Sequence, residues 1–300
     1  MSSQTSSNGH KSEQRSLAVA VVQLNSGADK RQNIASALAG IDQAARAGAR
    51  LVLLPEIWPY LGPEEENRAN AEAIPGPITD LFAERARQHG IYLHGGTILE
   101  ATPGDPRMFN TAFVLNPAGE IVARYRKIHM FDVVLGGGEQ YKESATMTPG
   151  DEIVTVEIDG LTVGLATCYD LRFPELFRIL ALRGADAVAL PAAFTLTTGK
   201  DHWEPLIRAR AIENGFYMMA SAQWGKHPPG NWCYGRSMIV DPWGTVLATA
   251  ADGVGMALTT ISQARVEAVR GQIPSLANRQ PHAYSWPTSS ETGLVSAQSS

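Results

Sequence analysis

The sequence predicts an α/β fold. Apolar runs of strand length alternate with helical patterns along most of the 300 residues, and 44% of the residues are hydrophobic. Such a chain buries an ample core, either as one large domain or as two smaller ones. No linker divides it, so we expect a single domain at 16–280, after a disordered polar leader at 1–15 and before a tail at 281–300.

Composition excludes several classes of protein. A net charge of -5 and a pI near 5.8 argue against a nucleic-acid binder held by phosphate contacts. No apolar run approaches the roughly 20 residues that span a bilayer, so we expect a soluble protein without a membrane partner. The first 15 residues lack the apolar segment of a signal peptide. Two cysteines, Cys168 and Cys233, cannot form a disulfide framework, which fits a reducing cytoplasm.

The first half of the chain contains five predicted strands and two predicted helices. The helices begin at Asp29 and near Ile78, and the second of them ends at His89. The strands are expected at 17–23, 49–54, 91–99, 109–115 and 121–125. A glycine-rich loop follows at 136–144. It lacks the Gly-Lys-Ser/Thr of a phosphate loop, so we interpret it as a flexible loop that gates a substrate site.

The second half repeats the alternation of strands and helices. Three helices are expected, at 174–183, at 201–214 with Gly215 as its stop, and ending at Arg270. The predicted strands lie at 153–158, 161–167, 187–190, 216–222, 237–240, 245–248 and 256–260. The first two form a hairpin through Asp159 and Gly160.

Cys168 stands where a buried strand ends and a helical pattern begins. Open α/β sheets usually bind ligands at the carboxyl ends of their strands. A thiol there also lies near the positive end of the next helix, where it can be kept as a thiolate and used as a nucleophile. The alternative is a buried cysteine that only packs, since free cysteine is among the most buried residue types.

Glu56 and Lys127 occupy equivalent places, at or just past the ends of two other predicted strands. A thiol of ordinary pKa, about 8.5, is mostly protonated at neutral pH and needs a base or a cation. Glu56 can take the proton, and Lys127 can stabilise the thiolate and then an oxyanion. Taken singly, Glu56 could be a helix cap or surface acid and Lys127 a solvated lysine.

Six further segments of the chain form a characteristic set. They are LPE (54–56), YRKIHMFD (125–132), CYDLRFPE (168–175), HWE (202–204), RARAIEN (208–214) and DPWG (241–244). Together they resemble the nitrilase superfamily of carbon-nitrogen hydrolases, most closely its Nit branch of omega-amidases and deaminated-glutathione amidases. The resemblance spans about residues 17–280, in the order of the family.

The resemblance implies an α-β-β-α sandwich that forms a homodimer, with a Glu-Lys-Cys triad at Glu56, Lys127 and Cys168. It also implies a second glutamate at Glu143, which orients the lysine or the substrate. Ala166 departs from relatives that often carry glycine two residues before the nucleophile, but this change removes no catalytic group.

The mechanism implied is attack of the Cys168 thiolate on a small amide, loss of ammonia or an amine, and hydrolysis of a thioester by water that Glu56 activates. Lys127 and the backbone N–H of Tyr169 would support the oxyanion. No cofactor or metal is implied, and the histidines show no zinc-ligand spacing.

Residues that bind the substrate are expected close to the nucleophile, at Tyr169, Arg172, Phe194 and Trp203. Arg172 either recognises a substrate carboxylate or forms a structural ion pair with Asp170. Phe194 and Trp203 either line the pocket or only pack in the core.

Two further residues, His129 and Cys233, allow more than one interpretation. His129 is the other possible base for Cys168, but the motif around a papain-type cysteine is absent. Cys233 is expected in a loop, in a packing role, because no acid or base lies near it in sequence.

The preferred function is an amidase acting on a small, carboxylate-bearing amide. The alternatives are an N-carbamoyl amino acid amidohydrolase, an aliphatic amidase or a nitrilase of the same superfamily, and a catalytically silent scaffold protein.

Overall fold

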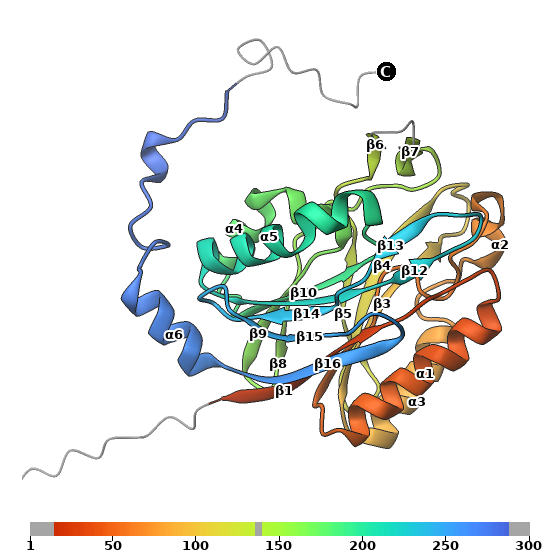
Figure 1. The fold of residues 1–300 in the computed structure, drawn as a ribbon, viewed down its shortest axis with the longest axis horizontal. Coiled ribbons are helices and arrows are strands. Elements are labelled where there is room, and N and C mark those ends of the chain that lie inside the picture. The colour runs from red at the N-terminus through yellow and green to blue at the C-terminus, as the bar shows by residue number, and fades with distance from the viewer. Residues whose placement is uncertain (1–14, 136–139, 288–300) are drawn as a thin grey trace, which may run out of the picture.

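Two six-stranded sheets pack face to face, and helices cover their outer faces (Figure 1). The structure, a computed structural model, describes residues 15–135 and 140–287. Helices α1 (Lys30–Arg46) and α3 (Pro77–His89) cover the first sheet, and α4 (Pro174–Leu182) and α5 (Leu196–Asn214) cover the second. The layers run helix, sheet, sheet, helix, which confirms the expected α-β-β-α sandwich.

The first sheet has three parallel strands at its centre and antiparallel strands around them. The parallel pairs are β1 with β2 and β2 with β3. In spatial order the strands are β16 (Gly255–Ser262), β1 (Ser16–Gln23), β2 (Leu51–Leu53), β3 (Tyr92–Ala101), β4 (Met108–Leu115) and β5 (Ile121–Arg126).

The second sheet repeats this plan, with β9, β10 and β11 as its parallel centre. In spatial order its strands are β15 (Val246–Thr249), β14 (Met238–Val240), β11 (Tyr217–Ala222), β10 (Ala187–Ala192), β9 (Leu161–Leu165) and β8 (Thr155–Ile158). Both parallel centres bring their carboxyl strand ends to one side of the molecule, where ligands bind in folds of this kind.

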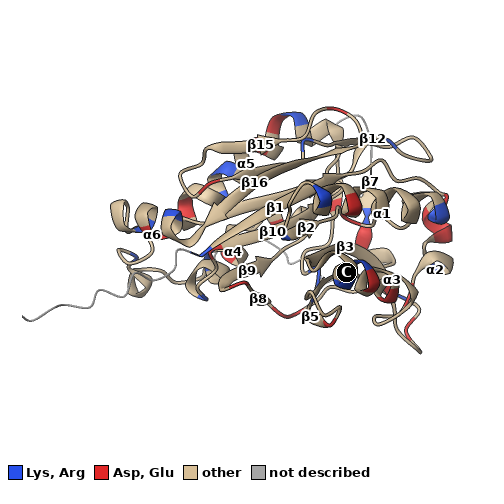
Figure 2. Ribbon diagram, turned by 90° about the horizontal axis from the view of Figure 1, so that it is seen from below, with Lys and Arg blue, Asp and Glu red and all other residues tan. Residues whose placement is uncertain are grey.

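The central strands are buried on both faces, which explains their unbroken apolar sequences. In β1, Val19 and Val21 point into the core between the sheets, whereas Ala20 and Val22 pack under α1 and α3. This alternation follows from the two-residue period of a strand. Figure 2 shows the charged residues mostly on helices and loops, with few on the central strands. Within the described ranges, no helix is long and apolar enough to cross a bilayer.

Several short elements complete the described structure. Two of them, β12 and β13, form a hairpin in a stretch where we expected a loop. These elements are η1 (Glu64–Glu66), α2 (Asn67–Asn70), β6 (Asp132–Val134), β7 (Gln140–Lys142), η2 (Glu143–Ala145), η3 (Cys168–Arg172), β12 (Trp224–Lys226), β13 (Trp232–Tyr234), α6 (Gln263–Gln272) and η4 (Pro281–Ala283). Of the expected gating loop, residues 136–139 lie outside the described residues, as do residues 1–14 of the leader and 288–300 of the tail.

Helix α5 begins at Leu196, five residues before the predicted start at 201. Its first turn contains two threonines and Gly199, which are poor helix formers, so the sequence pattern missed it. Packing decides the outcome here, because a Cβ on Gly199 would lie 2.4 Å from the Cβ of Tyr234 on β13. Glycine therefore lets the start of the helix press against that strand.

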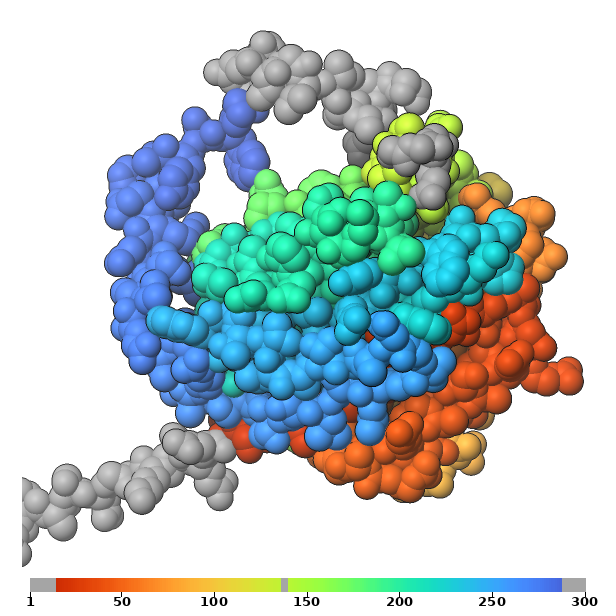
Figure 3. All heavy atoms as spheres, viewed as in Figure 1, coloured from red at the N-terminus to blue at the C-terminus, as the bar shows by residue number. Residues whose placement is uncertain are grey.

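The segment that follows α6 stands away from the body of the protein (Figures 1 and 3). It carries large apolar side chains into solvent, with Tyr284 67% and Trp286 81% exposed. Side chains of this size are normally buried, so their exposure points to a contact surface.

His94 on β3 is a buried histidine that the sequence analysis did not assign a role. Its Nδ1 accepts a hydrogen bond of 3.2 Å from the N–H of Gly96, which fits a neutral ring. Burial lowers the pKa of His94 to about 4. The unfolded chain, with an ordinary histidine pKa of about 6.5, therefore binds a proton more readily than the folded protein does.

We expect the free energy of unfolding to fall as the pH drops below about 6.5, and His94 alone should contribute a loss of about 2 kcal/mol between pH 7 and pH 5. Chemical denaturation at a series of pH values measures this slope. His94→Gln should flatten it, whereas His282→Gln, at an exposed position, should not. Equal slopes in all three proteins would show that His94 does not carry this pH dependence.

Candidate active site

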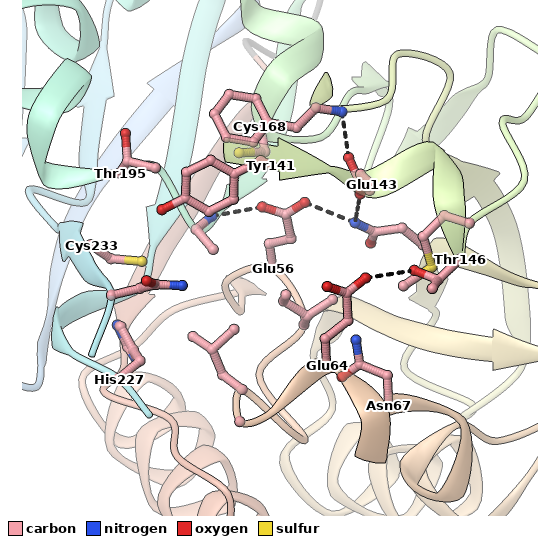
Figure 4. Close-up of a pocket in the computed structure, with 18 of the residues that line it drawn as sticks. Glu56, Glu64, Asn67, Tyr141, Glu143, Thr146, Cys168, Thr195, His227 and Cys233 are labelled. Carbon is pink, nitrogen blue, oxygen red and sulfur yellow. Dashed lines mark hydrogen bonds between the residues drawn. The ribbon is translucent and has the colours of Figure 1, made fainter. Parts of the chain in front are cut away.

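A cavity of about 610 Å³ opens beside the carboxyl ends of β2, β9 and β10. Its described lining includes the four residues expected to be catalytic, namely Glu56, Lys127, Glu143 and Cys168 (Figure 4). Glu56 and Lys127 come from the ends of strands in the first sheet, and Cys168 comes from the second. The packing of the two sheets thus brings together Glu56 and Cys168, which lie 112 positions apart in the sequence.

Glu56 is held by the turn that follows β2. The β3 strand bulges at Gly96, which has a φ of +65°. A Cβ there would lie 2.1 Å from the carbonyl oxygen of Pro55, so only glycine allows β3 to approach this closely. The hydroxyl of Thr97 accepts a hydrogen bond of 2.8 Å from the backbone N–H of Ile57, and the N–H of Thr97 donates to the carbonyl of Pro55. Both contacts fix the backbone on each side of Glu56.

The Lys127 ammonium is buried between two carboxylates. Its Nζ lies 3.1 Å from Oε1 of Glu56 and 2.8 Å from Oε2 of Glu143. Burial lowers the pKa of Lys127, but Glu143 and Glu56 more than offset this effect and hold the pKa well above its ordinary value. These contacts favour the charged form of Lys127, which has no lone pair with which to accept a proton.

Asn110 completes this cluster, and the sequence analysis missed it. Its Nδ2 donates to Glu56 at 2.8 Å and to Glu143 at 3.3 Å, and its backbone carbonyl accepts the backbone N–H of Lys127. A buried amide beside Thr111 in the otherwise apolar strand β4 was the available signal. The second oxygen of Glu56 accepts the N–H of Ala193 at 2.7 Å, so both oxygens of this carboxylate are held in place.

Cys168 begins the short helix η3 with a φ of +46°, a conformation that is uncommon for any residue but glycine. Such strain is typical of functional turns. Burial and the charge of Glu56 raise the pKa of the Cys168 thiol well above its ordinary value, and Lys127 only partly opposes them. Both effects favour the neutral thiol, whereas the place of Cys168 beside a helix N-terminus had suggested a thiolate.

His129 is turned away from the nucleophile. Its Nδ1 lies 2.7 Å from Asp170, and its ring stacks on Phe173. The ion pair considered between Asp170 and Arg172 is not formed. Asp170 instead binds Tyr125 on β5, His129 just past β5, and the backbone of Thr167 just past β9, because the fold brings these groups to it.

Two of the four residues expected to bind substrate, Tyr169 and Phe194, line the cavity. Trp203 does not line it. Trp203 is fully buried on α5, its ring packs 5.2 Å from that of Phe194, and its Nε1 donates to the carbonyl of Arg236. Arg172 also lies outside the lining. Its guanidinium sits over the Phe194 ring at 5.1 Å and contacts His202.

Cys233 lies on β13 and faces the cavity, so the expectation of a loop position was wrong. The strand was missed because it has three residues and no clear pattern. His227 lines the cavity beside it, and its Nδ1 donates to the carbonyl of Ser26 at 2.7 Å. Figure 4 places both residues on one side of Glu56, with Glu64 and Thr146 on the other.

No group of three or more His, Cys, Asp or Glu side chains that could hold a metal ion occurs within residues 15–135 and 140–287. The cluster of Glu56, Lys127, Glu143 and Cys168 does contain the parts needed for nucleophilic catalysis. They are a thiol, a carboxylate base beside it, and a fixed cation that can stabilise a developing oxyanion.

Proteins similar in sequence match most of the chain. The chain is 41% identical over 263 residues to a deaminated glutathione amidase of Synechocystis, which covers 87% of this chain and 97% of that protein. It is 37% identical over 269 residues to human omega-amidase NIT2, covering 90% and 97%.

Solved structures show the same fold. Nit3 of Saccharomyces cerevisiae, a member of the nitrilase superfamily, superposes with a TM-score of 0.80 at 30% identity and covers 89% of this chain and 96% of Nit3. The NitFhit protein of C. elegans gives a TM-score of 0.85 at 35% identity, over 90% of this chain and 66% of that longer one. Residues 18–271 match the carbon-nitrogen hydrolase family. The chain belongs to this family, within the nitrilase superfamily.

Proposed function

We propose that this protein is an amidase that hydrolyses a small, carboxylate-bearing amide through a thioester at Cys168. The observation that carries the proposal is the buried cluster in which Lys127 contacts Glu56 and Glu143 beside the Cys168 thiol. The names of the relatives, deaminated glutathione amidase and omega-amidase, support the same reaction class.

The first half of the reaction forms the thioester. As the sulfur of Cys168 attacks the amide carbonyl carbon, the thiol proton passes to Glu56. The carbonyl oxygen becomes an oxyanion, which Lys127 and the backbone N–H of Tyr169 stabilise. When the C–N bond breaks, the nitrogen takes the proton from Glu56 and leaves as ammonia or an amine.

The second half releases the acid. Glu56, again a carboxylate, takes a proton from water, and the hydroxide attacks the thioester carbonyl. The C–S bond breaks, the sulfur recovers the proton from Glu56, and the carboxylic acid leaves. Lys127 keeps its charge throughout, and Glu143 and Asn110 hold it and Glu56 in position.

We expect Cys168→Ala and Cys168→Ser to abolish turnover and to leave the fold intact, because the site is arranged around a thiol and a hydroxyl is a far weaker nucleophile. Loss of a nucleophile in such a unit costs several orders of magnitude in kcat. Ammonia release measures activity, and circular dichroism checks the fold. Cys233→Ser is the matched control for loss of a thiol from the same cavity. Retention of more than about a tenth of the activity in both Cys168 variants would contradict the cysteine mechanism.

The substrate carboxylate needs a cation that is free to bind it. Among the described residues that line the cavity, Lys127 and Lys142 are positively charged, and Lys127 is already paired with two carboxylates. Arg172 is not part of the described lining, and its guanidinium packs over the rings of Tyr169 and Phe194. We therefore assign the carboxylate to Lys142, with Arg172 in a supporting position behind Phe194 and Tyr169.

A linear omega-amide of a dicarboxylic acid should be hydrolysed at least about tenfold faster, in kcat/KM, than its neutral methyl ester or an aliphatic amide of equal length. The side chain of Lys142 is exposed, but a charge-assisted hydrogen bond from its ammonium to the carboxylate accounts for a difference of this size. Lys142→Met should reduce the preference, and Arg172→Met should change it less. Equal rates on neutral amides would remove the carboxylate from the proposal, and faster release from N-carbamoyl compounds or nitriles would assign the protein to another activity of the superfamily.

We further propose that the protein forms at least a dimer. Its support is the set of large apolar side chains left in solvent, which includes Ile212 and Trp243 on the body and Tyr284 and Trp286 on the C-terminal segment.

Sedimentation should give a mass near twice the 32.3 kDa of the chain, because burying these apolar side chains between two copies favours association. Trp286→Ser combined with Tyr284→Ser should weaken the association. A monomer at micromolar concentration in the wild type would rule the dimer out.

A further inference from the structure

Asp170 carries a fully buried carboxylate that accepts four hydrogen bonds. Its Oδ2 accepts from the hydroxyl of Tyr125 at 2.6 Å and from the N–H of Thr167 at 2.8 Å. Its Oδ1 accepts from the backbone N–H of His129 at 3.1 Å and from Nδ1 of the same residue at 2.7 Å. Burying a carboxylate costs free energy unless the carboxylate accepts hydrogen bonds in this way. Displacing any of these four donors would therefore destabilise the protein.

The positions of the donors in the sequence are informative. Thr167 directly precedes Cys168, and Asp170 follows it by two residues. Tyr125 lies two residues before Lys127 and His129 two residues after it. One carboxylate therefore binds the turn that presents the nucleophile and both flanks of the lysine.

A second contact joins the same two segments. The ring of His129 stacks on that of Phe173 with centroids 3.6 Å apart and planes within 7°. Phe173 directly follows η3, whose first residue is Cys168. The segment of Lys127 is thus joined at two points to the segment of Cys168, although these segments belong to different sheets.

Asp170 is not among the described residues that line the cavity, so it acts through its neighbours rather than on the substrate. Hydrogen bonds to a buried carboxylate are short and directional, and they transmit position well. A displacement of about 1 Å between reacting groups can cost roughly a hundredfold in rate.

We propose that Asp170 is a positioning residue that sets the separation of the Cys168 sulfur and the Lys127 ammonium. The proposal rests on the proposed amidase function only for its activity assay.

Asp170→Asn is the sharpest test, because it keeps the shape of the side chain and removes one acceptor. Whichever way the amide is turned, its NH₂ group faces a backbone N–H, that of Thr167 on one side or that of His129 on the other. Neither backbone group can become an acceptor, so one of the two segments must shift. We expect kcat to fall about a hundredfold and KM to change less than about fivefold, since none of the residues that line the cavity is replaced.

Asp241→Asn is the matched control. Asp241 is also a buried aspartate whose two oxygens accept several bonds, from the N–H groups of Trp243 and Thr245 and from Arg265, but it lies outside the described lining of the cavity. Its variant should lower the melting temperature and leave kcat per folded molecule within about threefold of wild type. A purely structural role for Asp170 would give this same pattern.

Alkylation provides a readout that needs no amide substrate. In a Cys233→Ser background, iodoacetamide reports on Cys168 alone. Asp170→Asn should slow this alkylation by about tenfold or more, because Glu56 takes the thiol proton as the sulfur attacks an electrophile, and in the variant the sulfur lies farther from Glu56 and from Lys127. A wild type that hydrolyses no amide would contradict the proposed function, while the alkylation rates would still decide the role of Asp170.

Tyr125→Phe gives a second variant in case Asp170→Asn does not fold. It removes one donor and keeps the aromatic body, so kcat should fall about three- to tenfold with KM unchanged. The positioning role is overturned if Asp170→Asn folds and keeps both kcat and the alkylation rate within threefold of wild type. It is equally overturned if Asp170→Asn does not fold and Tyr125→Phe has wild-type kcat.

Discussion

The rest of the site depends on the ion pairs that the buried Lys127 ammonium makes with Glu56 and Glu143. Taking this charge out of water costs several kcal/mol, and only close carboxylates with good geometry offset that cost. Glu56 and Glu143 supply them at 3.1 and 2.8 Å. Burial and the charge of Glu56 together raise the pKa of the nearby Cys168 thiol, and Lys127 only partly opposes them. Both effects favour the neutral thiol in the free site.

Holding these charges together requires both sheets. The first sheet supplies Glu56, Asn110 and Lys127, and the second supplies Cys168 and the N–H of Ala193 that fixes Glu56. Gln223, fully buried at the end of β11, donates to the carbonyl of Glu56 and so joins the sheets again. The apolar core between the sheets therefore does more than stabilise the fold, because a slip of one sheet on the other would separate the base from the nucleophile.

The sequence predicted those features that depend on local pattern. Glu56 and Cys168 each follow an apolar run, and Lys127 follows the alternating strand at 121–126, so all three strand ends are recognisable from the sequence pattern.

The features that depend on tertiary contacts were missed. Asp170 was compared with Arg172, its neighbour in sequence, but its partners come from β5 and from Thr167. Trp203 was placed in the pocket, whereas it supports Phe194 from behind. Asn110 lies on a strand that was predicted, but its contacts with Glu56 and Glu143 come from tertiary packing, and His227 and Cys233 reach the cavity from a short stretch with little periodic signal.

The raised pKa of Cys168 has a consequence for the chemistry of the cavity. Thiolates, not thiols, react with oxidants and electrophiles, so a site that stores a thiolate is exposed to side reactions. In the proposed mechanism, Glu56 takes the proton of Cys168 as the sulfur bonds to a carbonyl carbon. Burial also raises the pKa of Cys233, the second thiol on the cavity wall. Burial therefore favours the neutral form of both thiols, and in the proposed mechanism the thiolate character of Cys168 develops only as its sulfur attacks.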